Sequence, residues 1–178
     1  EVLAQTAARI QGTTASFSKE LIRRSVLAAA TAGQEPGDGH LRTATEVILA
    51  DGDRLSRALL GDARQLVAEA GPAPLVVARA FDGLGAAELR TLAQHLTSLA
   101  PCVALLGAGS ATAQVVFARS AGIGVDIAAL LQRALQRLGG RGGGRGDVVQ
   151  GGGPNAAELG PALEEAARAA REALAGQA

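Results

Sequence analysis

The sequence predicts an α+β protein in which a helical hairpin precedes a small sheet with helices on one of its faces. Two observations favour helices over an all-β fold: much of the 48% hydrophobic content is alanine, and aromatic residues make up only 2% of the 178 residues. A third observation concerns residues 71–74, where two prolines force extended chain. It predicts two domains, residues 1–72 and 73–178.

The first part of the chain has apolar residues at helix-compatible intervals. Residues 1–70 are expected to be helical, with an interruption at 12–14 and a loop at 33–39 that is rich in Gly, Pro and Asp. The second helix is expected at about 43–70, capped by Thr43 or Thr45. A hairpin this long rarely buries its apolar stripe alone. We therefore expect it to pack on another domain or another chain, for example as a homodimer through residues 1–72.

After the boundary, strand and helix patterns alternate. Asp126 is expected to cap the second helix of this part, and the last helix is expected to begin near Asn155. The expected order is β-α-β-β-α-β-α. The elements are a strand at 75–81, a helix at 85–99, strands at 102–106 and 114–118 around a turn at 107–110, a helix ending near 138, a β-like run at 147–150 and the last helix.

The glycine-rich stretch 139–153 is the most unusual feature of the sequence. Glycine lets a backbone approach a ligand closely, and successive exposed N–H groups form anion-binding nests. Arg141 and Arg145 add guanidinium forks suited to phosphate, and Arg133 and Arg137 precede them at i, i+4 on a helix. The four groups are expected to lie near one another, beside the N-terminus of the following helix. The stretch predicts a phosphate cradle; the plainer alternative is a tightly folded loop with solvated arginines.

This stretch resembles the glycine-rich signature near the C-terminus of alanyl-tRNA synthetases. The signature belongs to the DHH-associated domain, which these synthetases share with DHH-family phosphoesterases. The pattern is a glycine run, a basic residue, Asp-x-x-Gln and more glycine. Gly146 stands where the family often has Pro, and Val148 where Met is common. The likeness extends over 74–176 through the order of elements. The motif reads Gly142-Gly143-Gly144-Arg145-Gly146-Asp147-Val148-Val149-Gln150-Gly151-Gly152-Gly153.

The resemblance implies a non-catalytic role in RNA binding. In this family the C-terminal domain contacts the outer corner of tRNA and links the aminoacylation and editing domains, and its helical part can dimerise. The implied partners are tRNA(Ala) and the other domains of a parent alanine–tRNA ligase. The residues expected to contact RNA are Arg133, Arg137, Arg141, Gly142, Gly143, Gly144, Arg145 and Gln150.

The chain by itself offers no enzyme, cofactor or metal signal. His40 in a loop, His95 on a helix and Cys102 in a buried strand are too scattered for a metal site. Two alternatives stay open. One is the substrate-binding domain of a DHH phosphoesterase, although the chain lacks the Asp-His-His domain that this requires. The other is a dimerisation module that has lost tRNA binding, which a net charge of zero favours.

The sequence also bears on the compartment. No stretch approaches the roughly 18–20 apolar residues of a membrane span, and no signal peptide is visible. A chain that begins with Glu1 is expected to be cut from a longer protein. The lone cysteine favours a reducing compartment. Because basic charge is sparse and the glycine motif departs from the family pattern, we expect the mitochondrial matrix, with a bacterial cytoplasm as the alternative.

Overall fold

A computed structural model describes residues 15–70, 74–109 and 111–176 of the chain. The chain divides into two compact units, residues 1–57 and residues 58–178. The expected boundary at 72–73 and the expected interruption at 12–14 lie outside the described residues. Helices and strands are combined as in an α+β protein, so the predicted fold class is confirmed.

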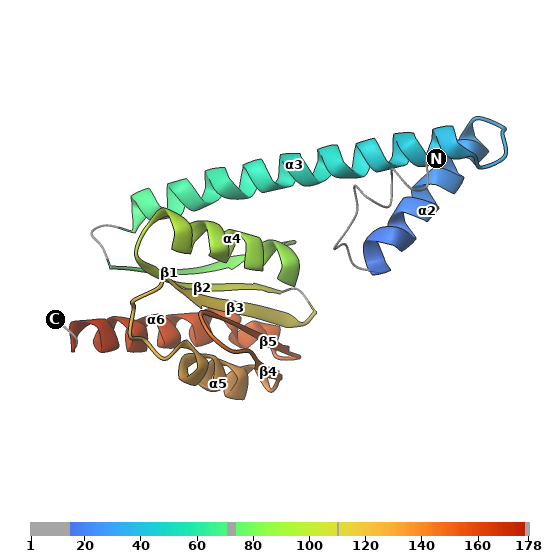
Figure 1. Ribbon diagram of the computed structural model, residues 1–178. Helices are drawn as coiled ribbons and strands as arrows, with labels where there is room; N and C mark the ends of the chain where they lie inside the picture. The colour runs from blue at the N-terminus through green and yellow to red at the C-terminus, as the bar shows by residue number, and fades with distance from the viewer. Residues whose placement is uncertain (1–14, 71–73, 110, 177–178) are drawn as a thin grey trace. The chain divides into compact units, whose positions relative to one another are not determined.

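The first unit contains helix α2 (Ala15–Thr31) and the beginning of helix α3 (Asp38–Glu69). The two form the expected helical hairpin (Figure 1). An ion pair joins them, with Arg24 Nη1 lying 3.0 Å from Asp51 Oδ2. Small side chains let the helices approach closely, since Ala29 is fully buried.

Helix α3 begins at Asp38, so the prediction that it begins near residue 43 was wrong. An aspartate in the first turn complements the positive end of the helix macrodipole. Thr43 and Thr45 do not cap the helix; each hydroxyl donates to the carbonyl four residues earlier, at 3.1 and 2.8 Å. His40, which was expected in a loop, therefore lies in the first turn of α3.

The second unit is built on a five-stranded sheet with the strand order β1-β2-β3-β5-β4. β1 and β2 are parallel and connected by a helix, whereas the other neighbours are antiparallel. The elements are β1 (Leu75–Phe81), α4 (Ala86–Leu99), β2 (Cys102–Gly109), β3 (Ala113–Arg119), α5 (Ile127–Leu138), β4 (Arg141–Gly143), β5 (Val148–Gly153), a 3₁₀ turn (Ala156–Glu158) and α6 (Leu159–Ala175).

Helices cover both faces of this sheet, and not one face as the sequence suggested (Figure 1). α5 and α6 pack on one face around Phe117. α4 and the C-terminal end of α3 pack on the other face around Leu106. The reason lies in β2, where every residue from Cys102 to Ala108 is buried. A strand with two apolar faces needs cover on both sides.

Several local sequence signals are confirmed in the second unit. Asp126 caps α5, because its Oδ1 accepts hydrogen bonds from the backbone N–H groups of Ala128 and Ala129, both at 3.0 Å. Gly139 ends the same helix in the left-handed conformation, with φ of 64°. Cys102 is a buried core residue, as expected, and burial raises the pKa of its thiol.

Candidate nucleic-acid interface

The glycine-rich stretch forms a β-hairpin at one edge of the sheet, where the sequence predicted a loop containing one β-like run. β4 is the edge strand, β5 lies between β4 and β3, and residues 144–147 form the turn. Gly146 in this turn has φ of +82°, which L side chains rarely adopt. Because two ladders use the backbone of β5, the amide groups left for a ligand belong to the turn and to the outer edge of β4.

Close backbone contacts explain the lack of side chains in this hairpin. A Cβ atom on Gly152 would lie 2.5 Å from the carbonyl oxygen of Ala113. A Cβ atom on Gly153 would collide with the carbonyl oxygen of Leu138. Gly143 differs, because a Cβ atom there would have no neighbour within 4 Å. Most of the strand glycines are therefore required by the packing of the hairpin against β3 and α5.

A depression of about 460 Å³ lies over the hairpin, at the first turn of α4. α4 packs against β2 and β3, whereas β4 and β5 pack mainly against α5 on the opposite face of the sheet. The α4 face of the hairpin is consequently left open. The residues that line the depression are Ala86, Gln114, Val115, Arg141, Gly142, Gly143, Gln150, Gly151 and Gly152.

The strand register places three polar side chains around this depression. Gln114 pairs with Gly152, and Gly152 pairs with Arg141, so one row crosses β3, β5 and β4. Gln150 belongs to the next row, where it pairs with Gly143. Paired residues share a face of the sheet. Gln114, Arg141 and Gln150 therefore all stand on the α4 face, around a floor of glycine.

The structure brings together only part of the predicted contact set. Four of the predicted residues line the depression: Arg141, Gly142, Gly143 and Gln150. Two more, Gly144 and Arg145, lie in the adjoining turn. Arg133 and Arg137 are on α5, against the opposite face of the sheet. The four guanidinium groups do not form one cluster, because the register points Arg141 away from α5. The N-terminus of α6 also lies on the face that carries α5.

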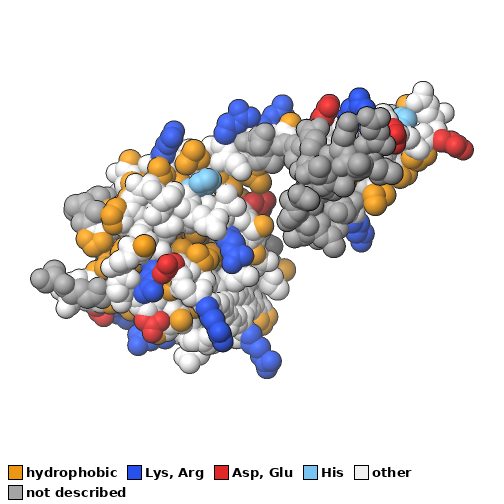
Figure 2. Space-filling view, viewed as in Figure 1, with side chains coloured by type: hydrophobic (Ala, Val, Ile, Leu, Met, Phe, Trp, Pro, Cys, Tyr) orange, Lys and Arg blue, Asp and Glu red, His pale blue; other side chains and the backbone are white. Residues whose placement is uncertain are grey.

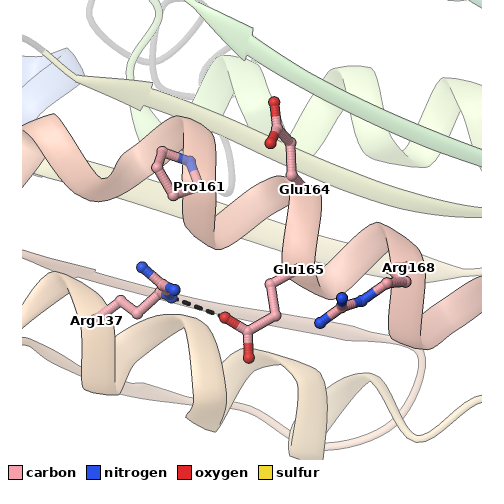
Figure 3. Close-up of a pocket in the computed structure, with 5 residues that line it drawn as sticks. All are labelled: Arg137, Pro161, Glu164, Glu165 and Arg168. Atoms are coloured by element: carbon pink, nitrogen blue, oxygen red, sulfur yellow. Dashed lines mark hydrogen bonds and ion pairs between the residues drawn. The ribbon is translucent and has the colours of Figure 1, made fainter.

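Arg137 is held by carboxylates of the following segment. Its Nε lies 2.7 Å from Glu165 Oε2, the pair drawn in Figure 3, and its Nη1 lies 2.7 Å from Glu158 Oε2. Hydrogen bonds raise the pKa of the Arg137 guanidinium, and the bond to Glu165 has a larger effect than the bond to Glu158. Glu164 and Arg168 line the same surface pocket from α6 (Figure 3). Arg137 thus joins α5 to α6, and its charge is already balanced within the chain.

The cations of the hairpin differ from Arg137 in this respect. Within the described part of the chain, no carboxylate forms an ion pair with Arg141 or Arg145. Both side chains are exposed. Figure 2 shows arginine and lysine side chains projecting separately from the surface, without a large basic patch on the side of the molecule that is in view. Positive charge that is available to a ligand at the hairpin therefore comes from these two arginines.

The acidic residue of the motif has a structural role. Asp147 Oδ1 accepts a hydrogen bond from Arg119 Nε at 2.9 Å, and the Arg119 backbone N–H donates to the Asp147 carbonyl at 3.0 Å. Arg119 Nη1 also donates to the carbonyl of Val125 at 2.9 Å. These bonds fix the hairpin turn to the end of β3. The two polar positions of Asp-x-x-Gln thus differ: Asp147 holds the turn, whereas Gln150 faces the depression.

Gln114 is the polar lining residue that is absent from the predicted contact set. The sequence places it at the start of a predicted strand and gives no separate reason to assign it a function. Its polarity is the available signal, because Gln114 is exposed in a strand where Ala113 and the residues 115–118 are buried. A single polar side chain in such a strand marks the place where one face of a sheet is uncovered.

Metal and membrane sites find no support in the described residues. Among residues 15–70, 74–109 and 111–176, no three His, Cys, Asp or Glu side chains gather closely enough to hold a metal ion. His40, His95 and Cys102 belong to α3, α4 and β2. Within the same ranges, no helix has the length and apolarity needed to cross a bilayer.

The mixed sheet and its glycine-rich edge hairpin together correspond to a known domain family. The DHHA1 domain family matches residues 73–175 of the chain. This match covers more than half of the chain and contains the whole sheet, including the glycine-rich hairpin. The chain therefore belongs to the DHHA1 domain family.

The similar curated proteins are alanine–tRNA ligases. The chain is 37% identical over 94 residues to a ligase of Thermus thermophilus, a match that covers 53% of this chain and 9% of the relative. It is 36% identical over 97 residues to the ligase of Methanothrix thermoacetophila, which covers 51% of this chain and 11% of the relative. The chain spans about a tenth of the length of these relatives.

Two solved structures share the fold. The C-Ala domain of Aquifex aeolicus alanyl-tRNA synthetase matches with a TM-score of 0.50 and 24% identity, covering 53% of this chain and 88% of that domain. RecJ of Thermus thermophilus matches with a TM-score of 0.56 and 19% identity, covering 96% of this chain and 28% of RecJ. Together with the family and the relatives, the first match confirms the resemblance to a C-terminal domain of alanyl-tRNA synthetases.

Proposed function

We propose that the chain is the C-terminal domain of an alanine–tRNA ligase, where it binds the corner of tRNA(Ala) and links aminoacylation with editing. The domain performs no catalysis itself in this proposal. The observation that carries it is the open depression over the glycine hairpin. Arg141 lines this depression and Arg145 lies in the adjoining turn, and neither has an ion-pair partner among the described residues. The identity of the ligand is supported by the relatives, whose names specify an alanine–tRNA ligase.

The charge distribution constrains how such a domain binds RNA. The net charge of the chain is zero, so no overall attraction draws a nucleic acid to it. Affinity must come from a few local contacts, of which guanidinium–phosphate pairs at Arg141 and Arg145 are the strongest. Arg137 adds little, because Glu158 and Glu165 already neutralise it.

Fluorescence anisotropy of labelled tRNA(Ala), titrated with the 178-residue chain at low and moderate salt, tests this function directly. We expect saturable binding that weakens as salt rises. Two phosphate contacts give a slope of log K against log salt of about −1.4 to −1.8, at roughly 0.7–0.9 per contact. A folded chain that binds no tRNA at low salt would contradict the proposal.

A second candidate function, homodimerisation through residues 1–72, is favoured by an apolar groove between α2 and α3. The groove measures about 460 Å³. Two of its large apolar residues are exposed to solvent, since Leu27 is 56% exposed and Val47 is 44% exposed. Both residues lie within the first unit, so the groove is a property of the hairpin itself. Exposed apolar surface on a helical hairpin favours association with another apolar surface.

Sedimentation equilibrium of the wild-type chain and a Leu27→Glu variant tests this second function. We expect a dimer at micromolar concentration for the wild type and a monomer for the variant, because a buried unpaired carboxylate is costly. Ala30→Glu is the matched control, since Ala30 is an exposed position of α2 that does not line the groove. A wild-type chain that stays monomeric at high micromolar concentration would exclude dimerisation through this groove.

The third alternative, a substrate-binding domain of a DHH phosphoesterase, rests on the fold alone. At 19% identity, the likeness to RecJ supports shared architecture and no shared ligand.

A further inference from the structure

We infer that the depression over the hairpin recognises an unpaired nucleotide, with Arg141 binding its phosphate and Gln114 and Gln150 donating to and accepting from the edge of its base. The inference rests on the proposed function, since it specifies which part of an RNA the same surface contacts. It adds a role for Gln114, which the sequence motif does not include, and it separates base recognition from phosphate binding.

The spacing of the three side chains follows from the strand register. Neighbouring strands lie about 4.8 Å apart, so Gln114 on β3 and Arg141 on β4 are separated by about 10 Å with one glycine between them. Gln150 is two residues from Gly152 on β5, which makes it a diagonal neighbour of Gln114 at about 7–8 Å. Gly152 leaves the space between these side chains empty. The open area therefore has polar groups on its two sides and no side chain on its floor.

The chemistry of the lining favours a base over a second phosphate. A glutamine carboxamide carries both N–H donors and a carbonyl acceptor, and base edges present the same two kinds of group. A phosphate has only acceptors, so it leaves the carbonyls of Gln114 and Gln150 unused. Among the described residues, no carboxylate lines the depression, which leaves the phosphate of the same nucleotide free to reach Arg141.

The shape favours an unpaired nucleotide over a duplex. The depression is bounded by Ala86 in the first turn of α4, and its volume of about 460 Å³ falls in the range of pockets for small ligands. In a duplex the Watson–Crick edges are already paired, and the deep, narrow major groove of RNA is closed to side chains. Bases in loops are unstacked and present their edges. None of the described lining residues is aromatic, so hydrogen bonds and not ring stacking must select the base.

Two fluorescently labelled RNAs test the inference: a stem–loop, and a blunt duplex that contains the same stem sequence and is lengthened by base pairs until it has the same number of phosphates. Each is titrated with the wild-type chain and with Gln114→Ala, Gln150→Ala and Gln132→Ala. We expect the wild type to prefer the stem–loop. We expect each of the first two variants to lose about 3- to 10-fold for the stem–loop, the range for one hydrogen bond, with duplex binding unchanged.

Gln132→Ala and one additional variant, Gln114→Met, make the test specific. Gln132→Ala is the matched control, because Gln132 is an exposed glutamine of α5 on the other side of the sheet, and its binding should equal the wild type. Gln114→Met keeps the length of the side chain and removes its polar atoms. It should lose as much stem–loop affinity as Gln114→Ala if hydrogen bonding is the cause.

The outcomes distinguish the two proposals. Equal binding of both RNAs by the wild type, with no effect of Gln114→Ala or Gln150→Ala, would overturn base recognition and leave RNA binding intact. Binding of neither RNA by a folded wild-type chain would overturn the proposed function and base recognition together. Full affinity in Gln114→Met combined with a loss in Gln114→Ala would assign Gln114 a packing role and overturn its part in reading the base.

Discussion

Alanine at both Arg141 and Arg145 is expected to weaken the binding of tRNA(Ala) by about 100-fold or more, since each charge-assisted hydrogen bond contributes about 1.5–3 kcal/mol. These two arginines are the exposed cations of the hairpin and have no ion-pair partner among the described residues. The magnitude of the negative slope of log K against log salt should also decrease by about 1.4–1.8, because two phosphate contacts are lost. Anisotropy titrations at three salt concentrations measure both quantities.

The matched control for this variant is Arg168→Ala combined with Arg171→Ala. It makes the same change in net charge, but on exposed positions of α6, which covers the other face of the sheet. We expect its affinity to stay within about threefold of the wild type, because screened charges far from the ligand contribute little. Equal losses in both double variants would indicate general charge attraction. Wild-type affinity in the hairpin variant would remove the hairpin from the RNA interface.

Replacement of Gly153 by alanine is expected to lower the free energy of unfolding by about 1–3 kcal/mol, the cost of forcing extra atoms into a packed site. The new Cβ atom would collide with the carbonyl oxygen of Leu138 at the end of α5 and with Gly140 Cα nearby. Backbone atoms cannot move aside as a flexible side chain does. Urea denaturation measures the change. The melting temperature should fall by about 2–4 °C for each kcal/mol in a chain of this size.

Gly143→Ala is the control for the packing argument. A Cβ atom at Gly143 meets no atom within 4 Å, and the residue lies in the same hairpin. We expect its free energy of unfolding to stay within about 0.5 kcal/mol of the wild type, as for surface substitutions in general. If both alanine variants unfold at the wild-type urea concentration, close packing does not explain the glycines of this hairpin.

Much of the fold follows from local sequence patterns. Apolar runs located β1, β2 and β3, and Asp126 marked the start of α5 correctly, because a capping side chain acts within three residues of its own position. The start of α3 was misplaced, since threonines that resemble caps bond to carbonyls inside the helix. Cover on both faces of the sheet depends on tertiary contacts. It was still visible in the apolar run of β2, which lacks alternation.

The candidate site was less predictable, because its geometry depends on strand pairing. The spacing of Arg133, Arg137 and Arg141 along the chain suggests a cluster, yet the register of β4 directs Arg141 to the opposite side of the sheet. Gln114 joins the site only through its pairing with Gly152, which lies far along the chain. Propensity and motif reading contain no information about such pairings.

The glycine floor of the depression also affects the entropy of binding. Long side chains at an interface lose rotamer freedom when a ligand arrives, at about 0.5–1.5 kcal/mol for each immobilised chain. Gly143, Gly151 and Gly152 have no rotamers to lose, and neighbouring strands already fix the backbone of the last two. A ligand that lies on this floor meets a surface already in its bound conformation. The ordering cost is then limited to the few polar side chains at its edge.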